Sequence, residues 1–294
     1  MDTTKNPTGL GLYNIAAHRA AKEVIYTYST SFGFATRILS KRIRHHVENI
    51  YAMVRVADEI VDGSAAQAAL FAPGLSPEKE IEAFELETYK AMDLGFSTNL
   101  VIHAFAITAR EVGIGKDIVE PFFYSMRQDL MEKEHDQASF EKYVYGSAEV
   151  VGLMCLAVFV HGKNYSHAEK TKLVLGARAL GSAFQKVNFL RDLSADFKRL
   201  GRSYFPGVNV ENFTEETKRR LVEDIAQDLT TSASSLGLLP KAARRAVTAA
   251  QLLFTELNLN IGNTSAANLI DTRIRVNNFK KLWLVARALL GAKL

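Results

Sequence analysis

Two pairs of aspartates share one spacing in this chain of 294 residues. Asp58 and Asp62 are four residues apart, and so are Asp192 and Asp196. Because an α-helix turns once in about 3.6 residues, both carboxylates of a pair project from one face, about 5–6 Å apart at Cβ. Like charges at this spacing destabilise an isolated helix by about 0.2–0.5 kcal/mol. Hard divalent cations would explain both pairs, since they take oxygen ligands and leave room for phosphate oxygens.

Two amides continue the line of the second pair. Gln185 and Asn188 precede Asp192 and Asp196 at steps of three and four residues, so one helical face carries all four side chains. Polar oxygens within an apolar element are costly to bury unless they are paired or metal-bound. This line is therefore predicted to face a cavity. The apolar residues that flank it are Phe184, Val187, Phe189, Leu190, Leu193 and Phe197.

Arg55 lies on the same helical face as Asp58 and Asp62, beside an apolar stripe formed by residues 47, 50, 54, 57 and 61. A cation next to two carboxylates can bind an anion together with the metals that bridge to it. A simpler interpretation stays open. Both acidic pairs could be solvated surface, with Arg55 and Arg191 acting only as ion-pair partners for nearby acids.

Helices must position these side chains, and apolar residues recur at steps of three and four along most of the chain. Gly176 and Gly181 are the points where the long second acidic helix could break. The Pro- and Gly-containing segment 63–77 and the polar segment 262–271 are predicted loops. No series of alternating strands is evident, so the fold is predicted to be all-α, a single domain over 1–294 in which 1–10 form a flexible segment. Helices are predicted at 11–28, 42–61, 78–94, 99–112, 115–132, 139–161, 167–196, 214–235, 240–261 and 276–292.

Composition sets the protein class. Hydrophobic residues make up 48% of the chain, which is ample for a core, and Cys155, the only cysteine, excludes an intramolecular disulfide. Cys155 is expected to be an inert buried thiol. The N-terminus lacks the layout of a signal peptide, and the longest apolar run, 150–160, is too short to span a bilayer. We expect a cytoplasmic protein that is soluble or at most peripheral.

Other chemistries lack their motifs. The glycines lack the pattern of a dinucleotide fingerprint or a phosphate-binding loop, and no Cys/His set has zinc-ligand spacing. No nucleophile-elbow pattern occurs. The net charge of +4 is spread along the chain without a recognisable nucleic-acid-binding module. We therefore expect neither a redox cofactor, nor covalent catalysis, nor a nucleic-acid partner.

Four short motifs carry a family resemblance. They are D-D/E-x-x-D at 58–62, Q-x-x-N-x-x-R-D-x-x-x-D at 185–196, R-x-Y-x-P at 202–206 and S-x-S-F at 29–32. From Tyr28 to Arg287 the chain resembles the squalene/phytoene synthase family, and 145–154 is most similar to bacterial phytoene synthases. Ser194-Ala195 depart from the Gly-Glu more frequent in relatives, and Phe254 stands where many relatives carry a tyrosine.

The resemblance implies an isoprenoid-synthase-type helical bundle around a central apolar cavity, and it assigns roles to residues. The metal ligands would be Asp58, Asp62, Asn188, Asp192 and Asp196. The four aspartates would be catalytic together with Arg55 and Tyr204. Diphosphate would contact Ser29, Ser31, Arg55, Gln185, Arg191, Arg202 and Arg273. The prenyl chains would contact Phe32, Tyr51, Tyr143, Ser147, Gly152, Phe184 and Phe189. Core packing is the competing interpretation for these aromatic residues, and close helix packing is the competing one for the small residues.

The implied activity is that of a prenyltransferase in carotenoid biosynthesis. Two geranylgeranyl diphosphates would condense head to head to phytoene through a cyclopropylcarbinyl (prephytoene) diphosphate, with release of diphosphate. Mg²⁺ would be required, with Mn²⁺ as a substitute, and no NAD(P)H. Squalene or dehydrosqualene synthesis from two farnesyl diphosphates is the alternative, and a non-catalytic helical assembly protein is a remote one. Because such substrates dissolve in membranes, we also expect peripheral lipid contact at the inner face of the cell membrane, involving the helix at 282–290. The oligomeric state stays open.

Overall fold

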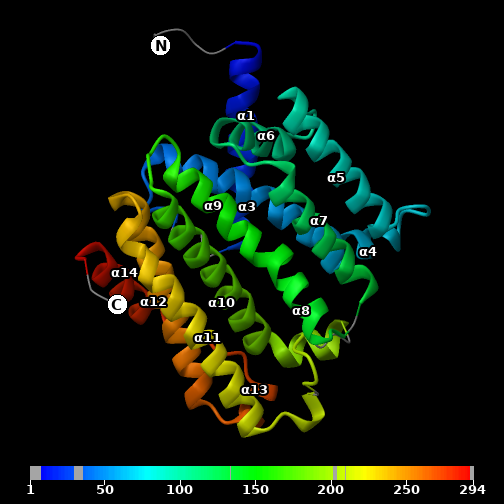
Figure 1. Ribbon diagram of the computed structural model, residues 1–294. Coiled ribbons are helices and arrows are strands. Elements are labelled where there is room, and N and C mark those ends of the chain that lie inside the picture. Colours follow the sequence, from blue (N-terminus) through cyan, green and yellow to red (C-terminus); the bar gives the residue numbers. More distant parts are fainter. Residues whose placement is uncertain (1–7, 30–35, 133, 201–203, 209, 292–294) are drawn as a thin grey trace. The chain divides into compact units, whose positions relative to one another are not determined.

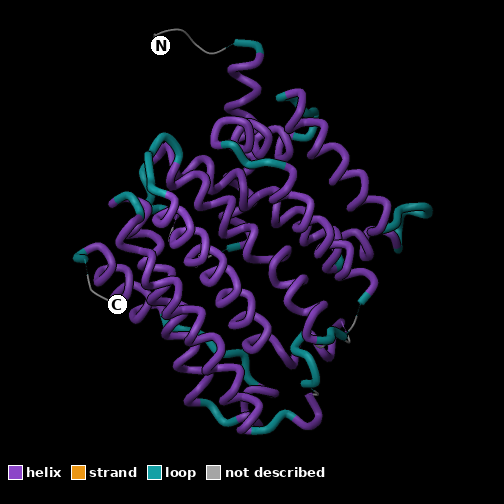
Figure 2. The backbone as a smooth tube through the Cα atoms, in the orientation of Figure 1, coloured by secondary structure: helices purple, strands orange, loops and turns teal. Residues whose placement is uncertain are grey.

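The computed structural model describes residues 8–29, 36–132, 134–200, 204–208 and 210–291, with the backbone alone at 194–200 and 210. Every regular element in these ranges is a helix (Figure 1; Figure 2). The all-α prediction is therefore confirmed. The chain divides into two compact units, Met1–Lys116 and Asp117–Leu294, which are described separately.

Unit 1 contains α1 (Leu10–Tyr28), α3 (Lys41–Asp62), α4 (Ser64–Ala69), α5 (Pro77–Leu94) and α6 (Leu100–Val112). Small side chains let α1 approach α3 and α6 closely, because Ala17, Ala21, Ala52 and Ala104 are fully buried together. The side-chain oxygen of Asn99 caps α6 by accepting hydrogen bonds from two N–H groups of its first turn. These contacts hold the first acidic helix, α3, on its apolar side.

The predicted apolar stripe of α3 is buried, with Val47, Ile50, Ala57 and Val61 all shielded from solvent. The helix ends at Gly63, whose φ of 135° suits glycine and strains other residues. This end follows Asp62 directly, so both aspartates of the first pair stand in the last two turns of α3.

Unit 2 is built around one long helix. Its elements are α7 (Lys116–Met131, which begins at the last residue of unit 1), α8 (Gln137–Val144), the π-helix η1 (Tyr145–Glu149), α9 (Val150–Val160), α10 (His167–Leu200), η2 (Val210–Asn212), α11 (Glu215–Ser235), η3 (Leu236–Leu238), α12 (Lys241–Asn263), α13 (Ala266–Asp271) and α14 (Asn278–Leu289). The second acidic helix, α10, packs against α9, α11, α12 and α13 (Figure 1).

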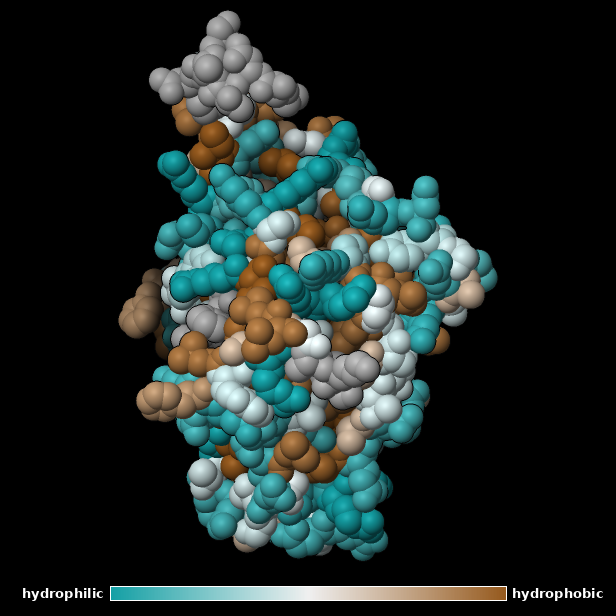
Figure 3. Space-filling view, turned by 90° about the vertical axis from the view of Figure 1, so that its left-hand side faces the viewer, coloured by the Kyte–Doolittle hydropathy of each residue, from teal (hydrophilic) through white to brown (hydrophobic). Residues whose placement is uncertain are grey.

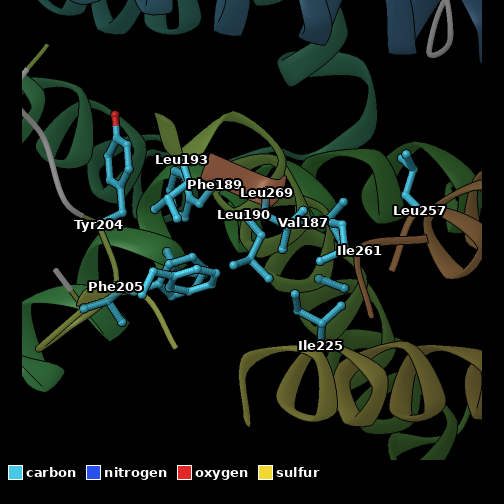
Figure 4. Packing of buried hydrophobic residues seen from close by; sticks show 14 of the residues in the cluster. Val187, Phe189, Leu190, Leu193, Tyr204, Phe205, Ile225, Leu257, Ile261 and Leu269 are labelled. Carbon is cyan, nitrogen blue, oxygen red and sulfur yellow. The ribbon is translucent and has the colours of Figure 1, made fainter. Parts of the chain in front are cut away.

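The core of unit 2 surrounds α10 with apolar side chains from several helices. Val187 and Leu190 of α10 face Ile225 of α11 and Ile261 of α12, and all four are fully buried (Figure 4). Each such side chain contributes about 1.5–3 kcal/mol relative to an exposed one. The apolar residues that flank the acidic line therefore anchor α10 in the core.

Glycines let the helices around α10 pack backbone to backbone. A Cβ atom at Gly152 on α9 would lie 2.4 Å from the carbonyl oxygen of Ala177, and one at Gly181 would lie 2.5 Å from that of Ala148. α10 is continuous through Gly176 and Gly181, so the break considered there does not occur. The close packing of the helices compensates for the low helix propensity of these glycines.

Two predicted loops contain short helices, so the loop prediction was wrong at these places. Residues 64–69 form α4, because Ser-Ala-Ala-Gln-Ala-Ala has a high intrinsic helix propensity. Residues 266–271 form α13, where the hydroxyl of Ser265 caps the first turn by accepting from the N–H of Asn268. The other predicted helices are confirmed.

The helix through α8, η1 and α9 is more apolar than the sequence pattern indicated. By length and composition alone, Gln137–Val160 could cross a membrane, which the apolar run 150–160 could not. Of its most apolar window, 44% is buried inside the structure. The close contact with α10 at Gly152 explains the apolar character of this helix, because it is a core element of unit 2.

Candidate functional site

In unit 1, Arg55 forms the centre of the polar face of α3. Its Nη1 donates to Asp58 Oδ2 at 2.5 Å, and its Nη2 donates to Glu59 Oε1. Its guanidinium carbon lies 4.7 Å from the centroid of the Tyr28 ring, at the end of α1. Burial alone would lower the pKa of Arg55, but the carboxylates of Asp58 and Glu59 outweigh it and raise the pKa. The arginine is a permanent cation beside the first acidic pair.

Tyr51 and Ser29 stand next to this ion-pair cluster. Tyr51 precedes Arg55 by one turn, and burial raises the pKa of its hydroxyl, opposed by the charge of Arg55 and by a hydrogen bond with Ser29. Ser29 is the C-cap residue of α1. Asp62, one turn beyond Asp58, is half-buried on the same helix. Tyr51, Arg55, Asp58 and Asp62 thus lie along one face of α3, and Ser29 at the end of α1 reaches this face through its hydrogen bond with Tyr51.

In unit 2, two arginines hold the carboxylate of Asp192. Arg191 Nη2 donates to Asp192 Oδ2 at 2.6 Å. Arg273, in the segment between α13 and α14, places its Nε 2.7 Å from Asp192 Oδ1. Asn188 and Gln185 precede Asp192 on α10 and are half-buried. In this structure both Arg55 and Arg191 do pair with acids close to them in sequence, as the simpler interpretation proposed.

Three of the predicted aromatic residues form one cluster in unit 2. Phe189 and Tyr204 stack with centroids 4.0 Å apart and an interplanar angle of 8°. Tyr143 lies 5.6 Å from Tyr204 and donates its hydroxyl hydrogen to Asp129 Oδ1 at 2.8 Å. Figure 4 shows Tyr204 beside Phe189 and Leu193. All three rings are buried, so both core packing and a ligand wall are compatible with their place.

Phe184 lies apart from this cluster. Its ring stacks on Phe254 with centroids 3.6 Å apart, so the phenylalanine that departs from the family pattern is a packing partner of a predicted site residue. Ser147 lies in the π-helix η1, and its Oγ is buried with no hydrogen-bond partner in the part of the chain that the structure describes. π-helical turns frequently mark functional sites. Gly152 is explained by its contact with α10.

Four predicted residues fall outside the described side chains. They are Ser31, Phe32, Arg202 and, on the last turns of α10, Asp196. Within the described residues no group of three or more His, Cys, Asp or Glu side chains could hold a metal ion. The described donors are the carboxylates of Asp58 and Asp62 on α3, and Asn188 and Asp192 on α10. They offer only oxygens of the kind that Mg²⁺ prefers, so their chemistry fits that ion.

Two acidic residues of the site were given no role from the sequence. Glu59 completes the ion-pair cluster of Arg55, and its position four residues later on the same helix was the available signal. Asp129 is the buried partner of Tyr143. Its only signal was a carboxylate on the apolar side of a predicted helix, which needs a hydrogen-bond donor.

Known proteins align with this chain over most of its length. A sequence model of the squalene/phytoene synthase family matches residues 25–280. The 15-cis-phytoene synthase of Pantoea ananas is 26% identical over 263 residues, which cover 82% of this chain and 81% of that protein. The phytoene synthase of Rhodobacter capsulatus is 25% identical over 289 residues, which cover 92% of this chain and 80% of that protein.

Solved structures with the same fold lie at lower identity. A dehydrosqualene synthase in complex with a ligand has a TM-score of 0.79 at 20% identity, covering 94% of this chain and 96% of that chain. A squalene synthase from Alicyclobacillus acidocaldarius has a TM-score of 0.72 at 16% identity, covering 86% and 95%. The predicted isoprenoid-synthase-type helical fold is thus confirmed.

The chain belongs to the squalene/phytoene synthase family. It is therefore a prenyltransferase, of the class that condenses prenyl diphosphates head to head.

Proposed function

We propose that the protein is a phytoene synthase, which condenses two geranylgeranyl diphosphates head to head and releases diphosphate. The observation that carries this choice of substrate is that bacterial relatives named phytoene synthase match the chain over most of their own length. The intermediate would be a cyclopropylcarbinyl diphosphate. Loss of a proton from the final cation would then leave the central double bond of phytoene, without NAD(P)H.

The arginines that pair with the acidic residues of α3 and α10 support binding of the diphosphate groups. Arg55, Arg191 and Arg273 all engage carboxylates in this structure. A guanidinium can exchange a carboxylate for a phosphate, because both accept two parallel hydrogen bonds from it. The Nε of Arg55 is buried and has no hydrogen-bond partner in the described part of the chain, so a phosphate oxygen there would satisfy it. Ser29, Ser31 and Gln185 would add neutral donors, and Arg202 would add a further cation.

The oxygen donors of α3 and α10 support a requirement for Mg²⁺, with Mn²⁺ as a substitute. Asp58 and Asp62 would contribute from α3, and Asn188, Asp192 and Asp196 from α10. When bound, the metal would neutralise the charge that develops on the departing diphosphate. The protein itself would hold these oxygens in place, keep its arginines within reach of the phosphates and exclude water.

The aromatic cluster of Tyr143, Phe189 and Tyr204 supports a chamber for an allylic cation. Departure of diphosphate leaves a carbocation that water would convert to an alcohol, so aromatic faces and a dry cavity favour condensation. Phe32, Tyr51 and Phe184 are the other aromatic residues that the family resemblance assigns to the prenyl chains. Ser147, whose buried Oγ lies in the π-helix η1, would lie where a chain passes close to the backbone.

A second candidate is condensation of two farnesyl diphosphates to squalene or dehydrosqualene. It is favoured by the names of the two solved structures described above. The two candidates differ in the length of apolar cavity that the chains need and, for squalene, in the need for NADPH.

The test uses purified full-length protein with Mg²⁺ and either geranylgeranyl or farnesyl diphosphate, with and without NADPH. Products are extracted and identified by mass. We expect phytoene from geranylgeranyl diphosphate, independent of NADPH and lost when EDTA removes the metal. Turnover of farnesyl diphosphate alone would overturn the choice of phytoene in favour of the second candidate.

A further inference from the structure

The helix α14 has an apolar outer face that no described residue of unit 2 covers. Its inner face, with Leu284 and Ala288, is buried against α12. On the outer face Phe279 is 87% exposed, Trp283 is 50% exposed and Leu290, the C-cap residue, is 88% exposed. Leu282 and Leu289 are exposed as well. Figure 3 views the side on which α14 lies in Figure 1, and brown apolar surface interrupts the hydrophilic surface there.

The exposed residues form a stripe and are not scattered. Residues 279, 282, 283, 286 and 290 follow one another at helical steps of three and four or as direct neighbours, so they occupy one side of α14. A contiguous apolar stripe of large side chains on an otherwise polar surface marks a contact surface. Single exposed apolar residues, such as Leu175 on α10, are ordinary and carry no such meaning.

The charges that α14 itself places beside the stripe are positive, and one of them, Lys280, pairs with Glu256 of α12, with 3.2 Å between Nζ and Oε2. α14 contains Lys280, Lys281 and Arg287 and no acidic residue. The Nζ of Lys280 lies 5.0 Å from the centroid of the Trp283 ring, and the guanidinium carbon of Arg287 lies 4.9 Å from it. The indole is thus held between two cations at the edge of the apolar face. An apolar face bordered by an indole ring and cations is typical of helices that lie at the boundary between acyl chains and anionic headgroups.

We propose that the outer face of α14 docks on the surface of a bilayer that contains anionic lipid. Apolar side chains would enter the acyl boundary, Trp283 would lie at the interface, and Lys280 and Arg287 would meet lipid phosphates. Charge favours lipid over a second copy of this chain. In a two-fold dimer through this face the cations of both copies would be brought together without an acidic partner on α14. The inference concerns this surface alone and does not depend on which prenyl diphosphate the enzyme uses.

Trp283 is the only tryptophan in the chain, so its fluorescence reports on this surface directly. The test adds the full-length protein to vesicles of phosphatidylcholine, with or without phosphatidylglycerol, at low and high salt. We expect a blue shift of emission and co-flotation with the anionic vesicles, both weakened by high salt. Neutral vesicles should bind much less. Absence of both signals with anionic vesicles at low salt would overturn the proposal.

Matched variants assign the effect to α14. Phe279→Ser combined with Leu282→Ser keeps the reporter and should lower vesicle binding by about tenfold or more, since each lost side chain contributes apolar burial. Leu175→Ser, an exposed leucine on α10, should leave binding unchanged. Arg287→Glu should weaken binding, whereas Arg245→Glu on α12 should weaken it less. Sedimentation without lipid completes the test, because a dimer that the double variant abolishes would assign this face to a second copy and overturn lipid docking.

Discussion

The guanidinium of Arg273 grips the carboxylate of Asp192 through two contacts, Nε to Oδ1 at 2.7 Å and Nη2 to Oδ2 at 3.2 Å. This pair joins the segment before α14 to the acidic line of α10. Arg191 holds the same carboxylate from within the helix. A metal ion that binds Asp192 must therefore displace at least one guanidinium, and a diphosphate that enters with the metal would offer the displaced arginine a new anion.

Replacement of Arg273 tests this exchange. In Arg273→Gln the variant should lose one or two charge-assisted hydrogen bonds to diphosphate, each contributing about 1.5–3 kcal/mol. We expect kcat/KM for the prenyl diphosphate to fall by about tenfold to a hundredfold, mainly through KM, as measured by steady-state assay. Arg275→Gln, two residues later and exposed, is the matched control and should keep near-normal kinetics. Equal losses in both variants would argue against a specific role for Arg273.

Replacement of Asp192 tests its proposed place among the metal ligands. Asp192→Asn keeps the shape of the side chain but removes the charge, so turnover should fall by at least about a hundredfold, whereas thermal unfolding should change little. Asp224→Asn is the control, because Asp224 also pairs with a cation of unit 2, Lys186, away from the acidic line. Retention of most activity in Asp192→Asn would contradict the proposed metal role.

Much of the fold was predictable because the signals were local. The apolar stripe of α3 and the amide–carboxylate line of α10 repeat at helical steps, and both helices begin or end within a few residues of the predicted limits. The helices α4 and α13 were missed because each is six residues long, too short for a periodic pattern to emerge.

The pairing within the site was less predictable, since it joins distant segments. Nothing in the spacing of Arg273 indicates that it contacts Asp192, 81 residues earlier. The same holds for Phe254 stacked on Phe184, and for Asp129 below Tyr143. The glycines show a related ambiguity. From the sequence alone, either a ligand or a neighbouring helix could pack against the backbone at Gly152. The close approach of the Ala177 carbonyl shows that it is a helix.

The hydrogen bond from Tyr143 to Asp129 should stabilise unit 2. Tyr143→Phe removes one donor from a buried carboxylate, so the free energy of unfolding should fall by about 1.5–3 kcal/mol. Urea denaturation followed by circular dichroism measures this loss. Tyr145→Phe is the control, because the ring of Tyr145 contacts Arg178 through its face and the substitution keeps that ring. A Tyr143→Phe variant as stable as the wild type would show that the bond contributes nothing net.

The contact between α9 and α10 should not tolerate a methyl group at Gly152. In Gly152→Ala the new Cβ would lie 2.4 Å from the Ala177 carbonyl oxygen, so the two helices must move apart, at a cost of about 1–3 kcal/mol. We expect a lower melting temperature. Gly237→Ala provides the control, because no atom lies within 4 Å of a Cβ at Gly237. If both variants have the melting temperature of the wild type, α9 and α10 are not in backbone contact at Gly152.

The stability of unit 1 should depend on the titration of His45. This residue lines a cavity of about 1120 Å³ between α1 and the start of α3, with its ring 3.8 Å from that of His18. Burial, and then the nearby His18, Lys41, His46 and Arg44, lower its pKa from 6.5 to about 4. Between these values the unfolded chain binds a proton that the folded His45 does not. The stability that neutral His45 preserves is therefore complete above pH 6.5 and is lost as the pH falls toward 4.

In His45→Asn this contribution is absent, so the urea midpoint should fall less steeply than that of the wild type as the pH is lowered from 7 to 4.5. The comparison of the two slopes cancels other groups that titrate in the same range. His161→Asn, an exposed residue after α9, controls for loss of a histidine as such. A slope in His45→Asn as steep as that of the wild type would mean that the pKa of His45 is not lowered in the folded protein.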